Sequence, residues 1–150
     1  WVIEPRRVDW YRSIDQKVTR PDALPEEFTQ TPGFNRHLDV LPDPRTRVVL
    51  PQLEGQSMMS TYYNANYVRG AEGEPRRYIA AMGPLDTTLV AFWRMVWCDE
   101  CYVIVMTTNT EERSTHQGQV IVKSKCERYW PEGIATTKEY SSPYGQFAVT

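Results

Sequence analysis

The chain has 150 residues, 41% of them hydrophobic and 24% charged, which is enough for one hydrophobic core and argues against disorder. Its 17 Lys and Arg residues against 19 Asp and Glu residues give a formal net charge of −2, so no global field favours nucleic acid or an anionic membrane. No apolar run reaches the ~18 to 20 residues that a membrane span needs, and the N-terminus lacks the apolar region of a signal peptide.

The first third of the chain is interrupted by prolines and predicts little regular structure. Apolar residues recur at helical spacing over residues 8–18, which predicts a short amphipathic helix. Prolines break this pattern, so residues 20–45 are predicted to be mostly loop. Residues 47–50 then have the composition of a strand.

The middle of the chain predicts two strands, a helix and a third strand. Residues 61–69 and 77–81 have strand composition, and the turn-forming loop between them favours an antiparallel pair. The helix that follows has Asp86 or Thr87 as its N-cap. Its apolar positions at i, i+3, i+4, i+7 and i+8 predict a deeply buried stripe that consists of Leu89, Phe92, Trp93, Val96 and Trp97.

The continuous apolar run over residues 101–106 is typical of a strand that is covered on both faces, which requires helices on both sides of its sheet. Residues 107–119 are polar and predict a loop, and residues 120–122 predict a short strand. Residues 144–150 alternate like a strand and end in mid-pattern, so we expect the segment to come from a longer domain. These elements together predict an α/β fold.

The cysteines are odd in number, which favours reduced thiols and a cytoplasmic location over a secreted disulfide framework. Cys98 and Cys101 have the spacing of a redox motif or half a zinc site, but the chain offers no second pair and only His37 and His116 as histidines. We therefore expect both thiols to pack as small hydrophobic groups, and Cys126 to be a core residue. The sequence predicts no metal, and the absence of a glycine-rich phosphate loop predicts no nucleotide cofactor.

Six sequence phrases resemble, in order, the N-terminal half of a protein tyrosine phosphatase domain. They lie at residues 35–42, 62–68, 78–85, 92–97, 103–106 and 125–131, and include Tyr-Ile-Ala-Ala-Met-Gly-Pro-Leu, Phe-Trp-Arg-Met-Val-Trp and Lys-Cys-Glu-Arg-Tyr-Trp-Pro. The resemblance implies a twisted mixed β-sheet flanked by helices, of which only the N-terminal part is present. Residues 34–150 would be half of this single domain, and residues 1–33 a helical and loop region before it.

The resemblance implies a cytoplasmic signalling enzyme that hydrolyses phosphotyrosine on proteins through a cysteinyl-phosphate intermediate. Such chemistry needs a Cys-x5-Arg motif and an aspartic acid that protonates the leaving phenol. No cysteine of this chain has an arginine six positions later. We therefore expect nucleophile and acid beyond residue 150, in the missing C-terminal half of the domain, and predict that the segment alone is inactive.

The resemblance also assigns residues to the recognition of a phosphotyrosine-containing protein substrate. In the family an aromatic residue of the recognition loop stacks on the phosphotyrosine ring; His37 occupies this position, beside Arg36. Asp39 matches the acidic residue that accepts a hydrogen bond from the backbone amide of the substrate peptide.

Further residues are implied to support the catalytic loops. Lys125 matches a lysine near the mobile acid loop. Glu111 or Glu112 matches the carboxylate that anchors the arginine of the phosphate loop, and an insertion before Lys125 leaves this choice open.

Three departures from the family pattern leave other functions open. His37 replaces the aromatic residue, Thr61 replaces an Asp and Met82 replaces a Gln. One alternative is therefore a non-catalytic pseudophosphatase, or a module that binds phosphotyrosine or a protein partner. Another is an unrelated α/β binding module that is complete at 150 residues.

Overall fold

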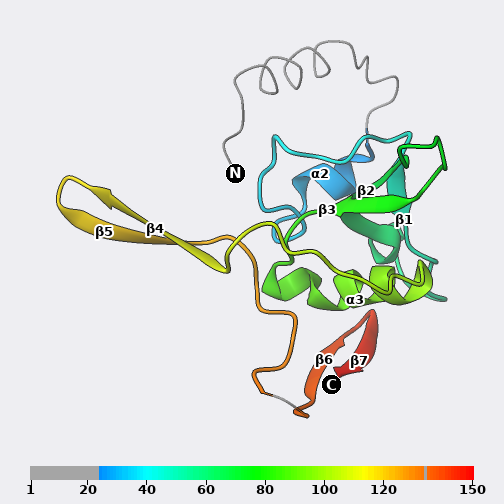
Figure 1. Cartoon of the computed structure of the whole chain (residues 1–150). Helices are drawn as coiled ribbons and strands as arrows, with labels where there is room; N and C mark the ends of the chain where they lie inside the picture. The colour runs from blue at the N-terminus through cyan, green and yellow to red at the C-terminus, as the bar shows by residue number, and fades with distance from the viewer. Residues whose placement is uncertain (1–23, 134) are drawn as a thin grey trace.

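The computed structural model describes residues 24–133 and 135–150 (Figure 1). The helix predicted over residues 8–18 lies outside the described residues. The first described element is α2 (Glu26–Gln30), which follows Pro25 and carries two glutamates in its first turn, where negative charge is favourable. The rest of residues 24–45 is loop, as predicted.

A three-stranded antiparallel sheet forms the centre of the fold. It consists of β1 (Arg47–Val49), β2 (Tyr62–Val68) and β3 (Tyr78–Ala81), with β2 in the middle. All three strands and the antiparallel pairing of β2 with β3 are confirmed. The predicted start of β2 is one residue early, because Thr61 ends a 3-10 turn, η1 (Met58–Thr61).

One helix covers each face of this sheet, because side chains alternate along β2. Tyr62 faces α2, where its ring stacks on Phe28 with the centroids 4.6 Å apart. Tyr63 faces the opposite side, where its ring meets Phe92 of α3 (Leu89–Cys98) at 5.9 Å. Helices α2 and α3 therefore lie on opposite sides of the sheet (Figure 1), and buried aromatic side chains pack on both faces of β2.

The predicted N-cap of α3 is wrong. A 3-10 turn, η2 (Asp86–Thr88), precedes the helix, and Thr88 is the residue at the N-cap position, without a side-chain cap on the helix itself. The Thr88 hydroxyl instead accepts a hydrogen bond from the Leu85 amide over 2.9 Å, and so it caps the 3-10 turn. Asp86 thus lies inside a turn that the sequence assigned to the start of the helix.

The apolar stripe of α3 is confirmed only in part. Leu89 and Phe92 are buried, whereas Trp97 is 77% exposed. Trp97 lies in the last turn of α3 and does not belong to the side chains that form or pack against the core. The sequence pattern marks an apolar face but not how far along the helix other segments cover it.

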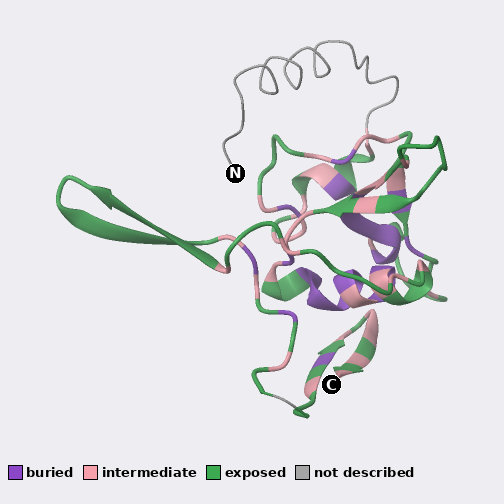
Figure 2. Ribbon diagram, viewed as in Figure 1, coloured by how far each residue is buried: buried purple, intermediate pink, exposed green. Residues whose placement is uncertain are grey.

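The predicted strand over residues 101–106 is wrong. This segment forms no ladder with any described strand, and Tyr102 and Val105 are 91% and 78% exposed (Figure 2). A strand exists only where a neighbour supplies its hydrogen bonds. The sequence predicted helices on both faces of a sheet that contains residues 101–106. The sheet with a helix on each face is instead the one formed by β1, β2 and β3.

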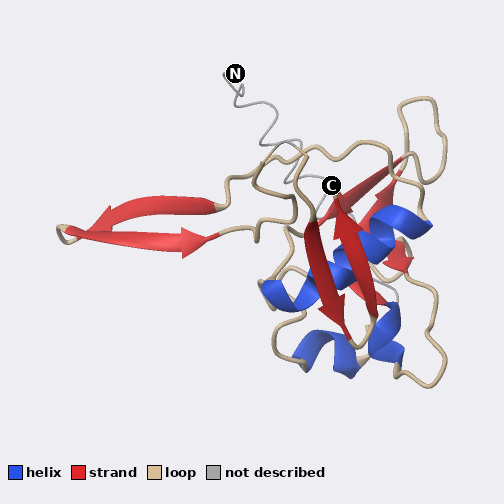
Figure 3. Cartoon of the chain, turned by 90° about the horizontal axis from the view of Figure 1, so that it is seen from below, coloured by secondary structure: helices blue, strands red, loops and turns tan. Residues whose placement is uncertain are grey.

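Two hairpins complete the described fold (Figure 3). The first is β4 (Glu111–His116) with β5 (Gln119–Ser124), and the second is β6 (Lys138–Ser142) with β7 (Gly145–Val149). The strands predicted over 120–122 and 144–150 are confirmed. The loop predicted over 107–119 is confirmed for residues 107–110 and for the turn at 117–118 but is wrong for residues 111–116, because β4 is polar on both faces and has no alternation that could reveal it.

The second hairpin packs on α3, on the side away from the sheet (Figure 3). Tyr140 of β6 is buried, and its ring lies 6.4 Å from that of Trp93. Among the described residues, no helix combines the length and apolar character that a membrane span requires.

Candidate functional site

Residues 35–42, here called the recognition loop, are attached to one face of β2. Asn35 is buried, and its Oδ1 accepts hydrogen bonds from the Tyr62 hydroxyl at 2.7 Å and from Asn64 Nδ2 at 2.9 Å. Its own Nδ2 donates to the Phe28 carbonyl at 2.7 Å. Asn64 Nδ2 also donates to the carbonyl of Val40 at 2.8 Å. Both ends of the recognition loop are therefore held by the central strand.

Arg36 connects the recognition loop to two other segments. Its Nη2 donates to the carbonyls of Pro84 at 3.0 Å and Gly83 at 3.5 Å, and its Nη1 donates to the carbonyl of Ser124 at 3.2 Å. The Arg36 amide donates to the thioether sulfur of Met82 at 3.1 Å. The guanidinium is thus occupied by carbonyls of this chain, which positions the recognition loop.

Gly83 permits a close approach of the chain at Cys126. A Cβ atom at Gly83 would lie 3.1 Å from Cys126 Cβ, from Cys126 Sγ and from the Lys125 carbonyl oxygen. Cys126 is 3% exposed, which confirms it as a core residue. Burial raises the pKa of its thiol, and Arg36 opposes this shift while Glu127 adds to it. Cys126 is therefore a poor nucleophile in this environment.

The structure places His37 in the lining of a cavity of about 420 Å³, together with other residues of the recognition loop. His37 and Asp39 are both exposed. The carbonyl of His37 accepts a hydrogen bond from the amide of Val40, which closes a turn that contains Asp39. Lys125 and Met82 line the same cavity. His37 and Lys125, two side chains that can carry a positive charge, thus line one cavity with Arg36, whose guanidinium donates to backbone carbonyls. Asp39 lies on the recognition loop outside it.

Of the two adjacent glutamates, the structure brings only Glu112 to Lys125. Glu112 Oε2 lies 2.9 Å from Lys125 Nζ. Glu111 and Glu112 point to opposite faces of β4, because successive side chains of a strand alternate. The amides of Lys125 and Cys126 both donate to the carbonyl of Thr110, so the ion pair sits at the base of the hairpin.

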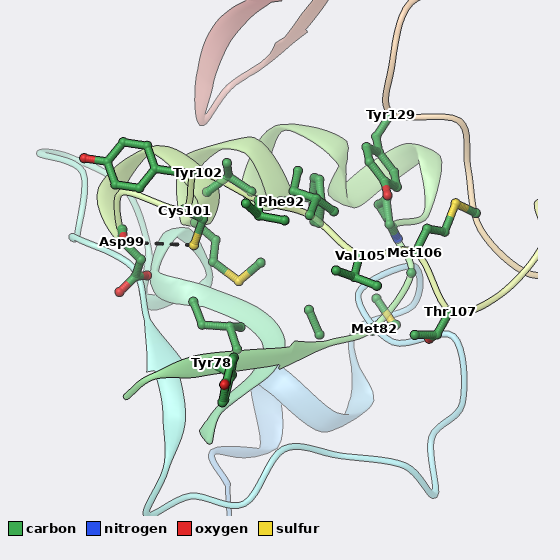
Figure 4. Close-up of a pocket in the computed structure, with 18 of the residues that line it drawn as sticks. Tyr78, Met82, Phe92, Asp99, Cys101, Tyr102, Val105, Met106, Thr107 and Tyr129 are labelled. Atoms are coloured by element: carbon green, nitrogen blue, oxygen red, sulfur yellow. Dashed lines mark hydrogen bonds between the residues drawn. The ribbon is translucent and has the colours of Figure 1, made fainter. Parts of the chain in front are cut away.

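A larger cavity of about 750 Å³ lies between β3, α3 and the segment 101–106 (Figure 4). Its wall is mostly apolar and includes Phe92 and Val105. At one end the Tyr67 hydroxyl donates to Asp99 Oδ1 at 2.8 Å. Burial and this hydrogen bond raise the pKa of Tyr67 to about 12. The cavity therefore offers apolar surface and no catalytic constellation.

Cys98 and Cys101 are free thiols. Cys98 is exposed, so the expectation that both thiols are packed is wrong for Cys98, because it ends α3 where no described segment covers the helix. Burial raises the pKa of the partly buried Cys101. Over residues 24–133 and 135–150, no group of three or more His, Cys, Asp or Glu side chains is arranged to hold a metal ion.

Some residues of the site could not be found from the sequence. Ser124 contributes only a backbone carbonyl, which leaves no mark in the sequence. Met82 stood out as a departure from the family phrase, but its role as an acceptor for the Arg36 amide depends on the folded chain. Thr108, which also lines the cavity of His37, lies in a segment without any motif.

Comparisons with known proteins agree on one family. A family model described as protein-tyrosine phosphatase matches residues 31–150. "Tyrosine-protein phosphatase non-receptor type 5" of Rattus norvegicus is 43% identical over 147 residues, which are 88% of this chain and 37% of that protein. Its Homo sapiens counterpart is 42% identical, with 88% and 24% covered. "Receptor-type tyrosine-protein phosphatase C" of Rattus norvegicus is 41% identical over 132 residues, with 86% and 10% covered. The chain thus spans well under half the length of these curated relatives.

Proposed function

The chain belongs to the protein-tyrosine phosphatase family, and from this premise we propose that the whole protein hydrolyses phosphotyrosine on other proteins. In this proposal residues 34–150 are the N-terminal half of the phosphatase domain and supply substrate recognition and scaffold, while residues 1–33 lead into it. The alternative of an unrelated α/β binding module is wrong, because the family model matches residues 31–150.

The observation that carries this proposal is the cavity that His37 and Lys125 share. In the proposal the flat imidazole of His37 stacks on the phosphotyrosine ring, and the Lys125 ammonium attracts the phosphate. Arg36 supports this arrangement, since it ties the recognition loop to Ser124, next to Lys125. The exposed Asp39 carboxylate is free to accept a backbone N–H of the substrate peptide.

We assign the nucleophile and the general acid to residues outside these 150. Phosphotyrosine hydrolysis through a covalent intermediate needs a thiolate whose phosphoryl group is held by a neighbouring arginine. Cys126 does not meet this need, since it is buried, its thiol pKa is raised, and position 132 is Glu132 rather than arginine.

We further propose Glu112, rather than Glu111, as the carboxylate that supports the catalytic loops, because Glu112 pairs with Lys125. The matched variants Glu112→Gln and Glu111→Gln test this choice in the whole protein. Exposed ion pairs contribute only about 0 to 1 kcal/mol, so both variants should keep nearly the stability of the parent. We expect Glu112→Gln alone to lower kcat. Equal kcat values for the two variants would contradict the assignment.

The recognition residues are tested with two substrates, a phosphotyrosine peptide and a small aryl phosphate. Asp39→Asn should lower kcat/KM for the peptide and leave the aryl phosphate unchanged, because only the peptide has a backbone amide to donate. His37→Ala should lower kcat/KM for both substrates by about three- to tenfold. This factor corresponds to the free energy of one aromatic contact, about 0.5 to 1.5 kcal/mol. If the whole protein hydrolyses neither substrate yet binds the peptide in calorimetry, it is a pseudophosphatase and the proposed activity is wrong.

We also propose a cytoplasmic location and a signalling role. Support comes from the three cysteines, which are all free thiols, as expected in a reducing compartment. Fractionation of cells that express the whole protein tests the location. Recovery of the phosphatase domain in a secreted or luminal fraction would contradict it.

A further inference from the structure

The hairpin of β4 and β5 projects away from the body of the molecule (Figure 1). Every residue of both strands is exposed (Figure 2). Three consecutive aliphatic side chains of β5 are among them, with exposed fractions of 68% for Val120, 38% for Ile121 and 50% for Val122. An isolated two-stranded hairpin is marginally stable in water, and exposed aliphatic rows usually mark a contact surface.

Within the described part of the chain β5 pairs with β4 alone, so no strand there pairs with its outer edge. Gln117 and Gly118, both with positive φ, form a two-residue turn between His116 and Gln119. In such a hairpin the pair next to the turn is hydrogen-bonded, and hydrogen-bonded and non-hydrogen-bonded pairs then alternate. Val120 therefore directs its N–H and C=O outward, as does Val122 two residues later.

This outer edge is complementary to itself. When two antiparallel strands are related by a two-fold axis, residues on the same face of the strand meet across it. With Ile121 on the axis, Val120 lies opposite Val122 of a second copy, and Lys123 lies opposite Gln119 of that copy. No like charges meet, and outward N–H and C=O groups of Val120 and Val122 satisfy one another.

The outer edge of β4 lacks this complementarity. An axis at Glu112 or at Arg113 places two like charges directly opposite each other, which is destabilising. An axis at Ser114 avoids this clash but buries no aliphatic side chain, since β4 has the sequence Glu-Glu-Arg-Ser-Thr-His. Charge and apolar character therefore both favour β5 over β4.

We propose that β5 is a self-association surface, along which two copies of the chain pair antiparallel with Ile121 on the two-fold axis. The two hairpins then form one four-stranded sheet in the order β4, β5, β5 of the second copy and β4 of the second copy. The contact closes on itself, so it forms a dimer and leaves no further β5 edge for growth. It also places Val120, Ile121 and Val122 beside aliphatic side chains of the second copy, which lowers their exposure.

Proline variants test the edge that is used, because proline removes an N–H donor. In the whole protein, Val120→Pro removes an outward donor of β5 that the hairpin ladder does not use. The matched control is Thr115→Pro, since Thr115 is the cross-strand partner of Val120 and directs its own N–H outward from β4. By sedimentation, we expect the parent and Thr115→Pro to be dimers, and the dimer dissociation constant of Val120→Pro to rise tenfold or more. A monomeric parent, or equal dissociation constants for the two variants, would overturn the proposal.

A disulfide tests the register without relying on a proline. The axis pair at Ile121 is non-hydrogen-bonded, with Cα atoms about 4.5 Å apart, which a disulfide can span. Ile121→Cys should therefore give a covalent dimer under a mild thiol oxidant. Ser114→Cys, whose two copies would be three strand spacings or about 14 Å apart, should not cross-link faster than the parent. A parent-like rate for Ile121→Cys would refute the register.

Discussion

Arg36 Nη1 donates a hydrogen bond to the carbonyl of Ser124 over 3.2 Å, although the two residues are 88 positions apart in the chain. The same guanidinium donates to the carbonyls of Gly83 and Pro84. One side chain therefore holds together three parts of the chain: the recognition loop, the residues Gly83 and Pro84 that follow β3, and the base of the β4–β5 hairpin. His37 and Lys125 line a common cavity because their immediate neighbours are joined in this way.

Arg36→Ala should destabilise the whole protein by about 2 to 4 kcal/mol, because the charge-assisted hydrogen bonds to three carbonyls are lost. The loss is measured as the change in unfolding free energy in urea. Arg45→Ala is the matched control, since Arg45 pairs with Asp43 at the exposed surface, and we expect no measurable change. Equal stability of the two variants would show that Arg36 does not hold the segments together.

Gly83→Ala should destabilise the protein by about 1 to 3 kcal/mol, as overpacking of a well-filled site does. The new Cβ would lie 3.1 Å from the buried Cys126 side chain and from the backbone oxygen of Lys125, and neither can move away easily. At Gly70 the nearest group to a new Cβ is the end of the flexible Glu74 side chain. Thermal unfolding should therefore show a clearly smaller loss for Gly70→Ala, and the opposite order would contradict the close approach.

Tyr67→Phe should cost about 1 kcal/mol at neutral pH, the typical value of a lost hydrogen bond, here to Asp99. The pKa of Tyr67 is raised from 10.0 to about 12 in the folded protein, so its contribution is complete below pH 10 and is lost as the pH rises towards 12. Urea unfolding from pH 8 to 12 should show the difference between parent and Tyr67→Phe shrinking over the last two pH units. A constant difference would argue against the raised pKa.

Thiol labelling should distinguish the three cysteines. Cys98 is exposed and should react first with a maleimide at neutral pH, whereas Cys126 is buried with a raised thiol pKa and should react only after unfolding. Cys101 is partly buried, with its pKa raised by burial and by Asp99, and should react at an intermediate rate. Peptide mapping by mass spectrometry gives the three rates, and labelling of Cys126 in the folded protein as fast as Cys98 would contradict its burial.

The sequence by itself determined the elements whose side chains show a local pattern. Strands β1, β2 and β3, helix α3 and the turn-forming loop between β2 and β3 all follow from periodicity and turn residues that lie close together in the chain. The family also followed from the sequence, because the phrases around residues 78–85 and 92–97 combine residue types that chance rarely repeats in order. The family match over residues 31–150 confirms this resemblance.

Tertiary structure alone decided what depends on distant segments. The run 101–106 is apolar enough for a buried strand, but no described strand pairs with it and Tyr102 stays exposed. The pairing of Lys125 with Glu112 rather than Glu111 depends on the strand geometry of β4, which its polar sequence does not reveal. The phrase around Arg36 marks it as part of a recognition loop, but its role in holding segments together arises from three carbonyls that folding brings to it. Periodicity reports which side of a segment is apolar, whereas pairing, coverage and carbonyl contacts are set by residues far along the chain.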